Sequence, residues 1–400
     1  MAKSKSFYLI LILGSLAALG PFSIDMYLPG FKAIAKDLNT DVPKVSLSLA
    51  SFFIGISAGQ LLYGPLLDKF GRKKPLYFGL TLYVVSSLCC LFVTSIDQLI
   101  ILRFIQAIGS CAAAVASIAM VRDLFTVEES PKVFASLLLV IALSPMLAPT
   151  AGGYLITALG WQSVFVFLSL MAILMLITTI WLLPESYKPD PAYSLKPKPI
   201  LTNFIIVLKE PSFYTYALVS AITFSGLFAY VSSSPVVFMD LYKVSETGYG
   251  WIFAILSVFF IGFSQVNSFI LRWFTSKSIV FWALVLQCLV SILFLIAALN
   301  NFLNLYTTIG FIALFLGCLG FINPNASALS LAPFTKNAGS ASALMGALQM
   351  GLGALASAAI SMFAADVVWP MPAVMTIATI IALVILLVGK NKINQHTINQ

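Results

Sequence analysis

The sequence contains very little charge for its length. Only 9% of its 400 residues are Asp, Glu, Lys or Arg, whereas 60% are hydrophobic and the mean hydropathy is +1.02. Soluble domains are about 25% charged and about 45–50% apolar. The composition therefore excludes a water-soluble protein. The apolar runs are also long and unbroken, which excludes a β-barrel, because barrel strands give short alternating segments.

Residues that bind metals are equally scarce. The only histidine, His396, lies in a polar tail, and the five cysteines form no CxxC pair and fall inside apolar runs. Free cysteine in such places usually behaves as a small hydrophobe, so we expect no metal site. The sequence also has no Gly-x-x-x-x-Gly-Lys-Ser/Thr loop for a nucleotide. We therefore expect no cofactor.

What the chain does have is long apolar runs. A helix needs about 20 apolar residues to cross the hydrocarbon core of a bilayer, and we count twelve such runs. They cover residues 7–29, 45–67, 75–95, 98–121, 133–158, 162–184, 213–239, 247–270, 278–299, 302–331, 338–364 and 369–389. The first run is longer than the apolar region of a secretory signal, about 7–15 residues, and no small-residue cleavage site follows it. We expect a retained helix there, in an all-α membrane protein.

A basic, proline-rich segment, "PESYKPDPAYSLKPKPILTNFIIVLKEPS" at 184–212, divides these runs six and six. We expect an N-terminal six-helix bundle at 1–184, a cytoplasmic linker at 185–212 with a short surface helix at 200–209, and a C-terminal six-helix bundle at 213–400. Two such halves are typical of transporters built from parallel repeats, with the substrate site between them.

The positive charges indicate the orientation. With both termini on one side, 17 Lys and Arg residues fall on that side and 4 on the other. Lys and Arg accumulate in cytoplasmic loops, so we expect both termini in the cytoplasm. The net charge of +8 follows from the same bias, and it is no evidence for nucleic-acid binding.

The loop between the second and third runs, "GPLLDKFGRKK" at 64–74, is unusually charged. It matches Gly-x-x-x-Asp-Lys/Arg-x-Gly-Arg-Lys/Arg, and so resembles the signature loop of the major facilitator superfamily. The resemblance implies the major facilitator fold of twelve helices in two six-helix bundles. It also implies that the loop staples the cytoplasmic helix ends together in the outward-facing state.

Each loop residue has an expected role. Gly64 and Gly71 allow tight turns and close approach. Asp68 is expected near the N-terminus of the eleventh helix, at 338–340, where an anion is favoured. Arg72 is expected to pair with Asp123 of "MVRDLF". The alternative is that Lys69, Arg72, Lys73 and Lys74 act only as topology anchors. We favour it for Lys73 and Lys74, and the staple for Asp68 and Arg72.

Four further stretches resemble the Bcr/CflA family of bacterial proton-coupled drug exporters. They are "SIDMYLPGFKAIAKDL", "LRFIQAIGSCAAAVASIAMVRDLF", "LSPMLAPTAGG" and "NPNASALSLAPF…AGSASALMGALQ". The third resembles the antiporter motif Gly-x-x-x-Gly-Pro-x-x-Gly-Gly. Here Pro145 and Pro149 are expected to bend the fifth helix, and Gly152 and Gly153 to allow close helix contact.

Only two ionisable residues lie clearly within the runs, Asp25 and Arg103. Intramembrane charges are functional candidates by default. In one reading the two residues form a permanent structural pair. In the other, which we favour, Asp25 carries a proton. Loss of water favours the neutral form of a carboxyl group and a nearby cation favours its ionised form, so a change of environment during the cycle could make Asp25 bind or release a proton. The resemblance implies coupling through this aspartate. Arg103 cannot carry the proton and is expected to support Asp25, with Gln106, one turn away, as its hydrogen-bond partner.

The substrate cavity is expected by analogy, since helices 1, 4, 7 and 10 line it in this fold. Candidate wall residues are aromatic or amide side chains, and packing is the alternative for each aromatic one. They are Phe22, Tyr27, Phe224, Phe228, Tyr230, Asn323, Asn325 and Gln349.

These observations and the resemblance favour an antiporter of the bacterial inner membrane that exports small, largely apolar compounds in exchange for protons. The resemblance also implies a monomer. Its partners would be small-molecule substrates, protons and the lipid bilayer, and the proton gradient would drive it. A dedicated exporter of one metabolite, such as a siderophore, nucleoside or amino-acid derivative, is the alternative. An enzyme would need a clustered nucleophile, base or metal set, which the sequence does not offer. A channel would conduct without a proton gradient, and neither class explains the charged loop.

Overall fold

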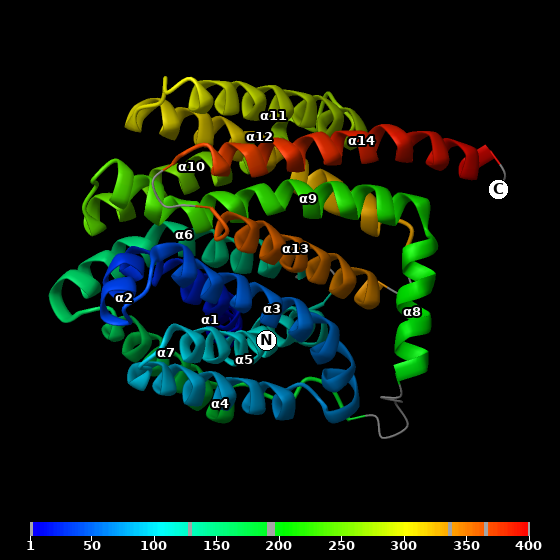
Figure 1. Ribbon diagram of the computed structural model, residues 1–400. Coiled ribbons are helices and arrows are strands. Elements are labelled where there is room, and N and C mark those ends of the chain that lie inside the picture. The colour runs from blue at the N-terminus through cyan, green and yellow to red at the C-terminus, as the bar shows by residue number, and fades with distance from the viewer. Residues whose placement is uncertain (1–2, 127–129, 190–196, 335–337, 364–366, 399–400) are drawn as a thin grey trace. The chain divides into compact units, whose positions relative to one another are not determined.

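The computed structural model describes residues 3–126, 130–189, 197–334, 338–363 and 367–398. All regular structure in these residues is helical (Figure 1). The described helices include twelve that are long and apolar enough to cross a membrane, which confirms the predicted number of spans. The chain divides into two compact units, of which the first comprises Met1–Lys196 and Glu246–Ala254, and the second Pro197–Ser245 and Ile255–Gln400.

The first unit is built from seven helices and the beginning of an eighth. They are α1 (Lys3–Asp25), α2 (Phe31–Asp37), α3 (Val42–Phe70), α4 (Lys73–Cys89), α5 (Ile96–Leu124), α6 (Ser130–Leu159), α7 (Gln162–Trp181) and the start of α10 (Glu246–Ile270), with short 3-10 helices at Leu28–Gly30 and Cys90–Phe92.

Local sequence sets the ends of these helices. Asp41 caps α3 by accepting a hydrogen bond from the Lys44 N–H, at 2.8 Å, and Ser95 caps α5 in the same way. Gly71, with φ of 82°, ends α3 in the left-handed region that favours glycine. The α3 and α5 helices pack closely where Gly55 has no side chain. A Cβ at this position would lie only 2.6 Å from the Phe104 carbonyl oxygen.

The first membrane span differs from its prediction. The apolar run expected at 7–29 continues as one span from Phe7 to Asp37, although its helix is interrupted after Asp25 and resumes as α2. The sequence "LPG" at 28–30 is responsible, since proline and glycine both disfavour a continuous α-helix.

The second unit contains the linker helix and the remaining spans. They are α8 (Pro197–Lys209), α9 (Pro211–Ser234) with a π-helical end at Pro235–Leu241, the rest of α10, α11 (Ser276–Leu299), α12 (Leu305–Leu331), α13 (Ala338–Ile360) and α14 (Pro370–Ile398). The short helix predicted at 200–209 is confirmed as α8, which turns away from the direction of α9 (Figure 1).

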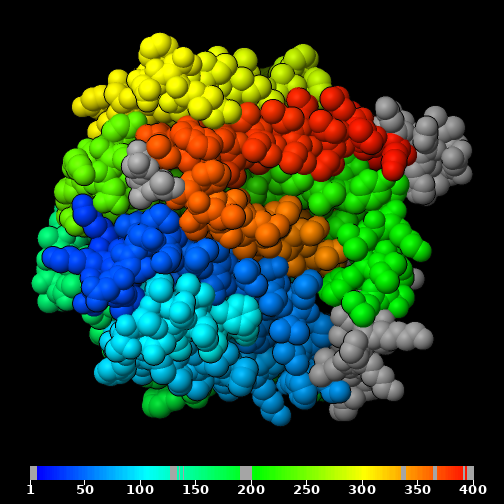
Figure 2. Space-filling model, in the orientation of Figure 1, coloured from blue at the N-terminus to red at the C-terminus, as the bar shows by residue number. Residues whose placement is uncertain are grey.

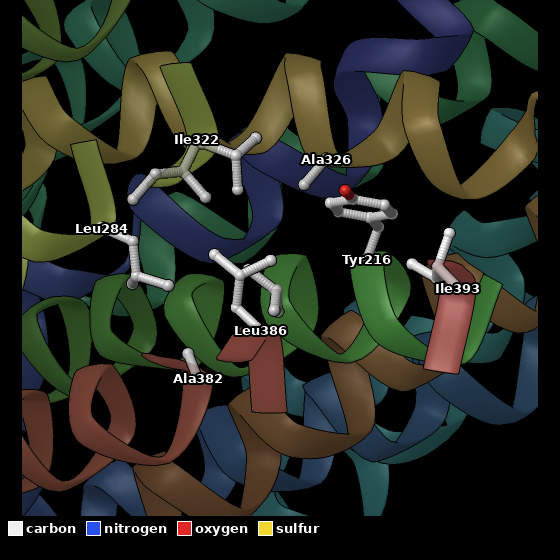
Figure 3. Close-up of a cluster of buried hydrophobic side chains, with 9 residues drawn as sticks. Tyr216, Leu284, Ile322, Ala326, Ala382, Leu386 and Ile393 are labelled. Carbon is white, nitrogen blue, oxygen red and sulfur yellow. The ribbon is translucent and has the colours of Figure 1, made fainter. Parts of the chain in front are cut away.

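Apolar side chains hold this unit together. Figure 3 shows one cluster formed by α9, α11, α12 and α14. Its buried members are Tyr216, Val219, Val280, Leu284, Ile322, Ala326, Ala382, Leu386 and Ile393. Other side chains of α14 are exposed, because this helix lies on the surface of its unit (Figure 2). Ile377, Val384 and Val388 are more than half exposed. Exposed aliphatic side chains on a span of this length are suited to contact with lipid tails.

Candidate functional site

Asp25 is the last residue of α1 and only 6% exposed. It falls within the apolar stretch Phe7–Asp37, which is long enough to cross a membrane. Within the described part of the chain no basic residue forms an ion pair with its carboxylate. The structural pair of Asp25 with Arg103, one of the two readings of the sequence, is therefore absent.

Arg103, on α5, is fully buried and binds neutral partners instead. Its Nη1 donates to Gln106 Oε1 at 2.6 Å, which confirms Gln106 as a hydrogen-bond partner. Its Nη2 donates to the backbone carbonyl oxygen of Ser23 at 2.8 Å, two residues before Asp25. Arg103 is thus next to the chain of Asp25 but is not bonded to its carboxylate.

Aromatic rings surround the Arg103 guanidinium. Its central carbon lies 4.1 Å from the ring centroid of Phe52, 4.6 Å from that of Tyr27 and 6.0 Å from that of Phe165. The negative face of an aromatic ring attracts a cation, by about 2 kcal/mol or more when water is excluded. We call these three rings the aromatic cage, and it replaces the carboxylate that a buried arginine would otherwise need.

Hydroxyl groups extend the network around Arg103. Gln106 Nε2 donates to Ser87 Oγ at 2.6 Å, and Ser87 Oγ donates to the carbonyl oxygen of Tyr83 at 2.7 Å. The hydroxyls of Ser23 and Tyr83 lie 2.6 Å apart. These serines and Tyr83 were not predicted from the sequence, because single serines in apolar helices are too common to single out.

Of the predicted wall residues of the first unit, Tyr27 is 1% exposed. Its ring packs on Arg103, Phe31 and Phe165, and its hydroxyl bonds to Ser48. Tyr27 therefore packs inside its own unit in this structure, rather than on an open wall. Phe22 is half-buried.

Two predicted wall residues of the second unit come together with a third residue that the sequence analysis missed. Ser220 on α9 donates to Asn323 Oδ1 on α12 at 2.7 Å, and Gln349 Nε2 on α13 donates to both, at 2.9 and 3.2 Å. Asn325 does not join them. Its Nδ2 donates to Asn267 Oδ1 at 2.7 Å and to the Phe321 carbonyl oxygen at 2.8 Å.

The aromatic wall residues of α9 pack mostly inside the second unit. Phe228 is 4% exposed, and its ring lies against Phe224 and against the backbone of Gly353. Tyr230 is 1% exposed. Only Phe224 is half-buried, so burial favours packing for Phe228 and Tyr230.

The proline and glycine motif of α6 fixes the segment after Asp25. Pro145 and Pro149 lie inside the helix. Gly152 faces the backbone of Met26 so closely that a Cβ would overlap its carbonyl oxygen. A Cβ on Gly153 would lie 2.7 Å from the carbonyl oxygen of Glu246, in the part of α10 that belongs to the same unit.

The charged loop is organised by Arg72, which is 7% exposed. Its Nε donates to Asp123 Oδ2 and its Nη1 to Asp68 Oδ1, both at 2.8 Å. The predicted pairing with Asp123 is thus present. Burial by itself lowers the pKa of the guanidinium, but the hydrogen bonds and charges of Asp123 and Asp68 outweigh it and raise the pKa overall. Because the pKa is raised, the stabilisation from the charged arginine is present throughout the physiological range and lost only at more alkaline pH.

Two further expectations for the loop have different outcomes. Among the described residues of the first unit, no atom lies within 4 Å of the position of a Cβ on Gly64, so no close approach is found there within this unit. The expected contact of Asp68 with the start of α13 joins the two units and stays a prediction. Three residues around this loop were not predicted from the sequence: Glu185 and Tyr187 contact Arg72, and Ser186 contacts its partner Asp123.

Comparisons with known proteins agree with this architecture. The family model of the Major Facilitator Superfamily matches residues 13–358. A "Bicyclomycin resistance protein homolog" of Haemophilus influenzae is 32% identical over 369 residues, 92% of each chain. A "Multidrug resistance protein MdtL" of Shigella flexneri is 27% identical over 338 residues, 84% of each chain. The crystal structure of a D-xylose-proton symporter has the same fold, with a TM-score of 0.73, 15% identity and coverage of 94% of this chain and 97% of that one.

The family model spans most of the chain, and a relative above 30% identity covers nearly all of it. The chain therefore belongs to the Major Facilitator Superfamily, in the Bcr/CflA branch that its motifs resemble.

Proposed function

We propose that the protein is a proton-coupled efflux transporter that exports small, largely apolar compounds by alternating access. The relatives named for bicyclomycin and multidrug resistance support drug-like substrates. Proton exchange is what the Bcr/CflA resemblance implies, and it requires no cofactor besides the proton gradient. The same reasoning supports a transporter rather than an enzyme, acting as a monomer in the bacterial inner membrane with both termini in the cytoplasm.

The observation that carries the proposal is the isolation of Asp25. It is a buried carboxyl group inside a membrane span, and no described residue forms an ion pair with it. Carboxyl groups at such positions are expensive to insert and mark proton relays in pumps and transporters. We assign proton binding to Asp25.

Arg103 and its cage have a supporting role in this proposal. The guanidinium cannot release its proton, so it stays positive through the cycle. Its hydrogen bond to the Ser23 carbonyl oxygen fixes the end of α1, and Gly152 fixes the next turn against α6. Asp25 therefore lies between two anchored points of the backbone. In the second unit, the amides of Asn323 and Gln349 remain our candidates for substrate contact.

The test is proton release from purified protein when candidate substrates are added. We expect release from the wild type and none from Asp25→Asn, with substrate binding retained. Asp97→Asn is the matched control, because Asp97 is an exposed carboxylate at the start of α5, and it should behave as the wild type. Equal release from wild type and Asp25→Asn would contradict the assignment of Asp25.

A competition panel separates the proposal from the alternative function. Displacement of one bound compound by several unrelated apolar compounds supports a multidrug exporter. Displacement by a single compound class, such as a siderophore, nucleoside or amino-acid derivative, supports a dedicated metabolite exporter.

A further inference from the structure

The segment Glu185–Tyr187, which we call the linker strap, lies where the chain leaves α7 and enters the linker. It contacts the charged loop at the junction of α3 and α4. Both carboxylate oxygens of Glu185 accept backbone N–H groups, Oε1 from Arg72 at 2.8 Å and Oε2 from Lys73 at 3.1 Å. The first N–H groups of a helix have no partner within it, and Lys73 is the first residue of α4. Glu185 therefore caps α4 from a distant part of the chain.

The strap also covers the Arg72 ion pairs. The ring centroid of Tyr187 lies 4.3 Å from the central carbon of the Arg72 guanidinium, and Ser186 Oγ donates to Asp123 Oδ2 at 2.9 Å. The side chains of Arg72 and Asp123 are only 9% and 15% exposed in this arrangement. Ion pairs are stronger where water is excluded, so the strap strengthens the pair that organises the loop.

Contacts from the loop back to the end of α7 complete the connection. Lys73 Nζ donates to the carbonyl oxygen of Leu183 at 2.7 Å and to that of Ile180 at 3.3 Å. Lys73 was expected to be a topology anchor only, and it has this second contact as well. A Cβ on Gly71 would lie 3.1 Å from a Glu185 carboxylate oxygen, so the strap packs closely against this glycine. The positive φ of Gly71 favours glycine at the same position.

We propose that the linker strap is a positioning element of the transport cycle. It locks the charged loop, the start of α4 and the end of α7 into one rigid block, in which Arg72 keeps its geometry. The strap continues directly into the linker between the two units, so it joins the loop to the segment through which the units are connected. This role rests on the proposed transport function, but the rigidity of the block does not.

Hydrogen exchange tests the rigidity without any substrate. In the full-length protein in lipid nanodiscs, we expect Glu185→Ala to speed backbone exchange in 72–77 by about threefold to tenfold, the effect of losing a helix cap. Glu185→Gln keeps one accepting oxygen and should give a smaller change. Lys188→Ala is the control, since Lys188 is exposed and lies just beyond the strap.

Transport kinetics test the role in the cycle. The probe is ethidium, taken up by inverted vesicles under an imposed proton gradient. We expect Glu185→Ala and Tyr187→Ala to lower the maximal rate by about threefold to tenfold, which corresponds to the loss of one charge-assisted contact, with KM within twofold. Tyr187→Phe keeps the ring face over Arg72 and should restore the wild-type rate.

The outcomes distinguish a failure of the strap proposal from a failure of the proposed transport function. Unchanged exchange in Glu185→Ala overturns the rigid block, and changed exchange with an unchanged maximal rate overturns its role in the cycle. A Tyr187→Phe variant as slow as Tyr187→Ala, or a KM that rises with the rate loss, also overturns it. Absence of ethidium uptake by the wild type counts against the proposed function, and the exchange data then decide on the strap.

Discussion

At the scale of single residues, the two buried arginines described in the first unit, Arg72 and Arg103, show opposite ways to neutralise a buried charge. Arg72 lies between two carboxylates, whereas Arg103 is bound by a carbonyl oxygen, an amide oxygen and aromatic rings. The first arrangement was predictable, because Arg72 and Asp123 are opposite charges that fall at the same end of neighbouring spans. The second was not, because backbone carbonyls and aromatic faces are present everywhere in such a sequence.

Arg72→Ala should destabilise the first unit by about 1–3 kcal/mol, because it leaves the partly buried carboxylate of Asp123 without its positively charged donor. The measurement is the midpoint of thermal unfolding in detergent. Lys74→Ala is the matched control, since Lys74 is exposed in the same loop, and its midpoint should equal that of the wild type. A shift of equal size in both variants would mean that the loop responds only to net charge.

Removal of one ring from the aromatic cage should destabilise the protein as well. Phe52→Leu keeps most of the apolar volume but removes the ring closest to Arg103, and we expect a loss of about 1–2 kcal/mol. Phe53→Leu makes the same change of side chain at an equally buried position that is not part of the cage. The proposed cage is contradicted if thermal unfolding gives the same loss for both variants.

At the scale of helices, the sequence predicted the number of spans and their approximate positions, because each apolar run is long enough to form one helix. It did not predict the break after Asp25, the continuation of the first span into α2, or the π-helical end of α9 at Pro235–Leu241. The break after Asp25 has a local cause in the proline and glycine of Leu28–Gly30, but the length of the apolar run does not reveal it. The position of Gly152 against Met26 depends on how distant segments of the chain pack, so local composition does not predict it.

Gly152→Ala should therefore lower stability by about 1–3 kcal/mol, because the added methyl group overlaps the backbone of Met26 and overpacks the contact. Gly310→Ala is the matched control in α12, where a Cβ would meet no atom within 4 Å. There the substitution should be neutral or slightly stabilising, since alanine favours a helix over glycine. Comparing their unfolding midpoints checks this, and equal midpoints would rule out a tight α1–α6 contact.

At the scale of the whole molecule, the distribution of Lys and Arg predicts one orientation in the membrane. In intact cells, a membrane-impermeant maleimide should label a cysteine substituted at Asn300, between α11 and α12, at the outer surface. A cysteine at Lys277, at the other end of α11, should react only after permeabilisation. Labelling of the native cysteines is the background, and it is measured in the unsubstituted protein. The reversed labelling pattern would place both termini outside.

The aromatic cage has a consequence for the response to membrane voltage. Rings attract a cation but do not cancel its charge, so the apolar interior of the first unit holds the full positive charge of Arg103. A charge that moves across the membrane changes in energy by about 2.3 kcal/mol per 100 mV. When Asp25 is ionised, Asp25 and Arg103 have no net charge together, and the proton binding proposed for Asp25 would leave a net charge of +1 on the pair. The binding of a proton would thus change the net interior charge that a movement of this unit carries through the electric field.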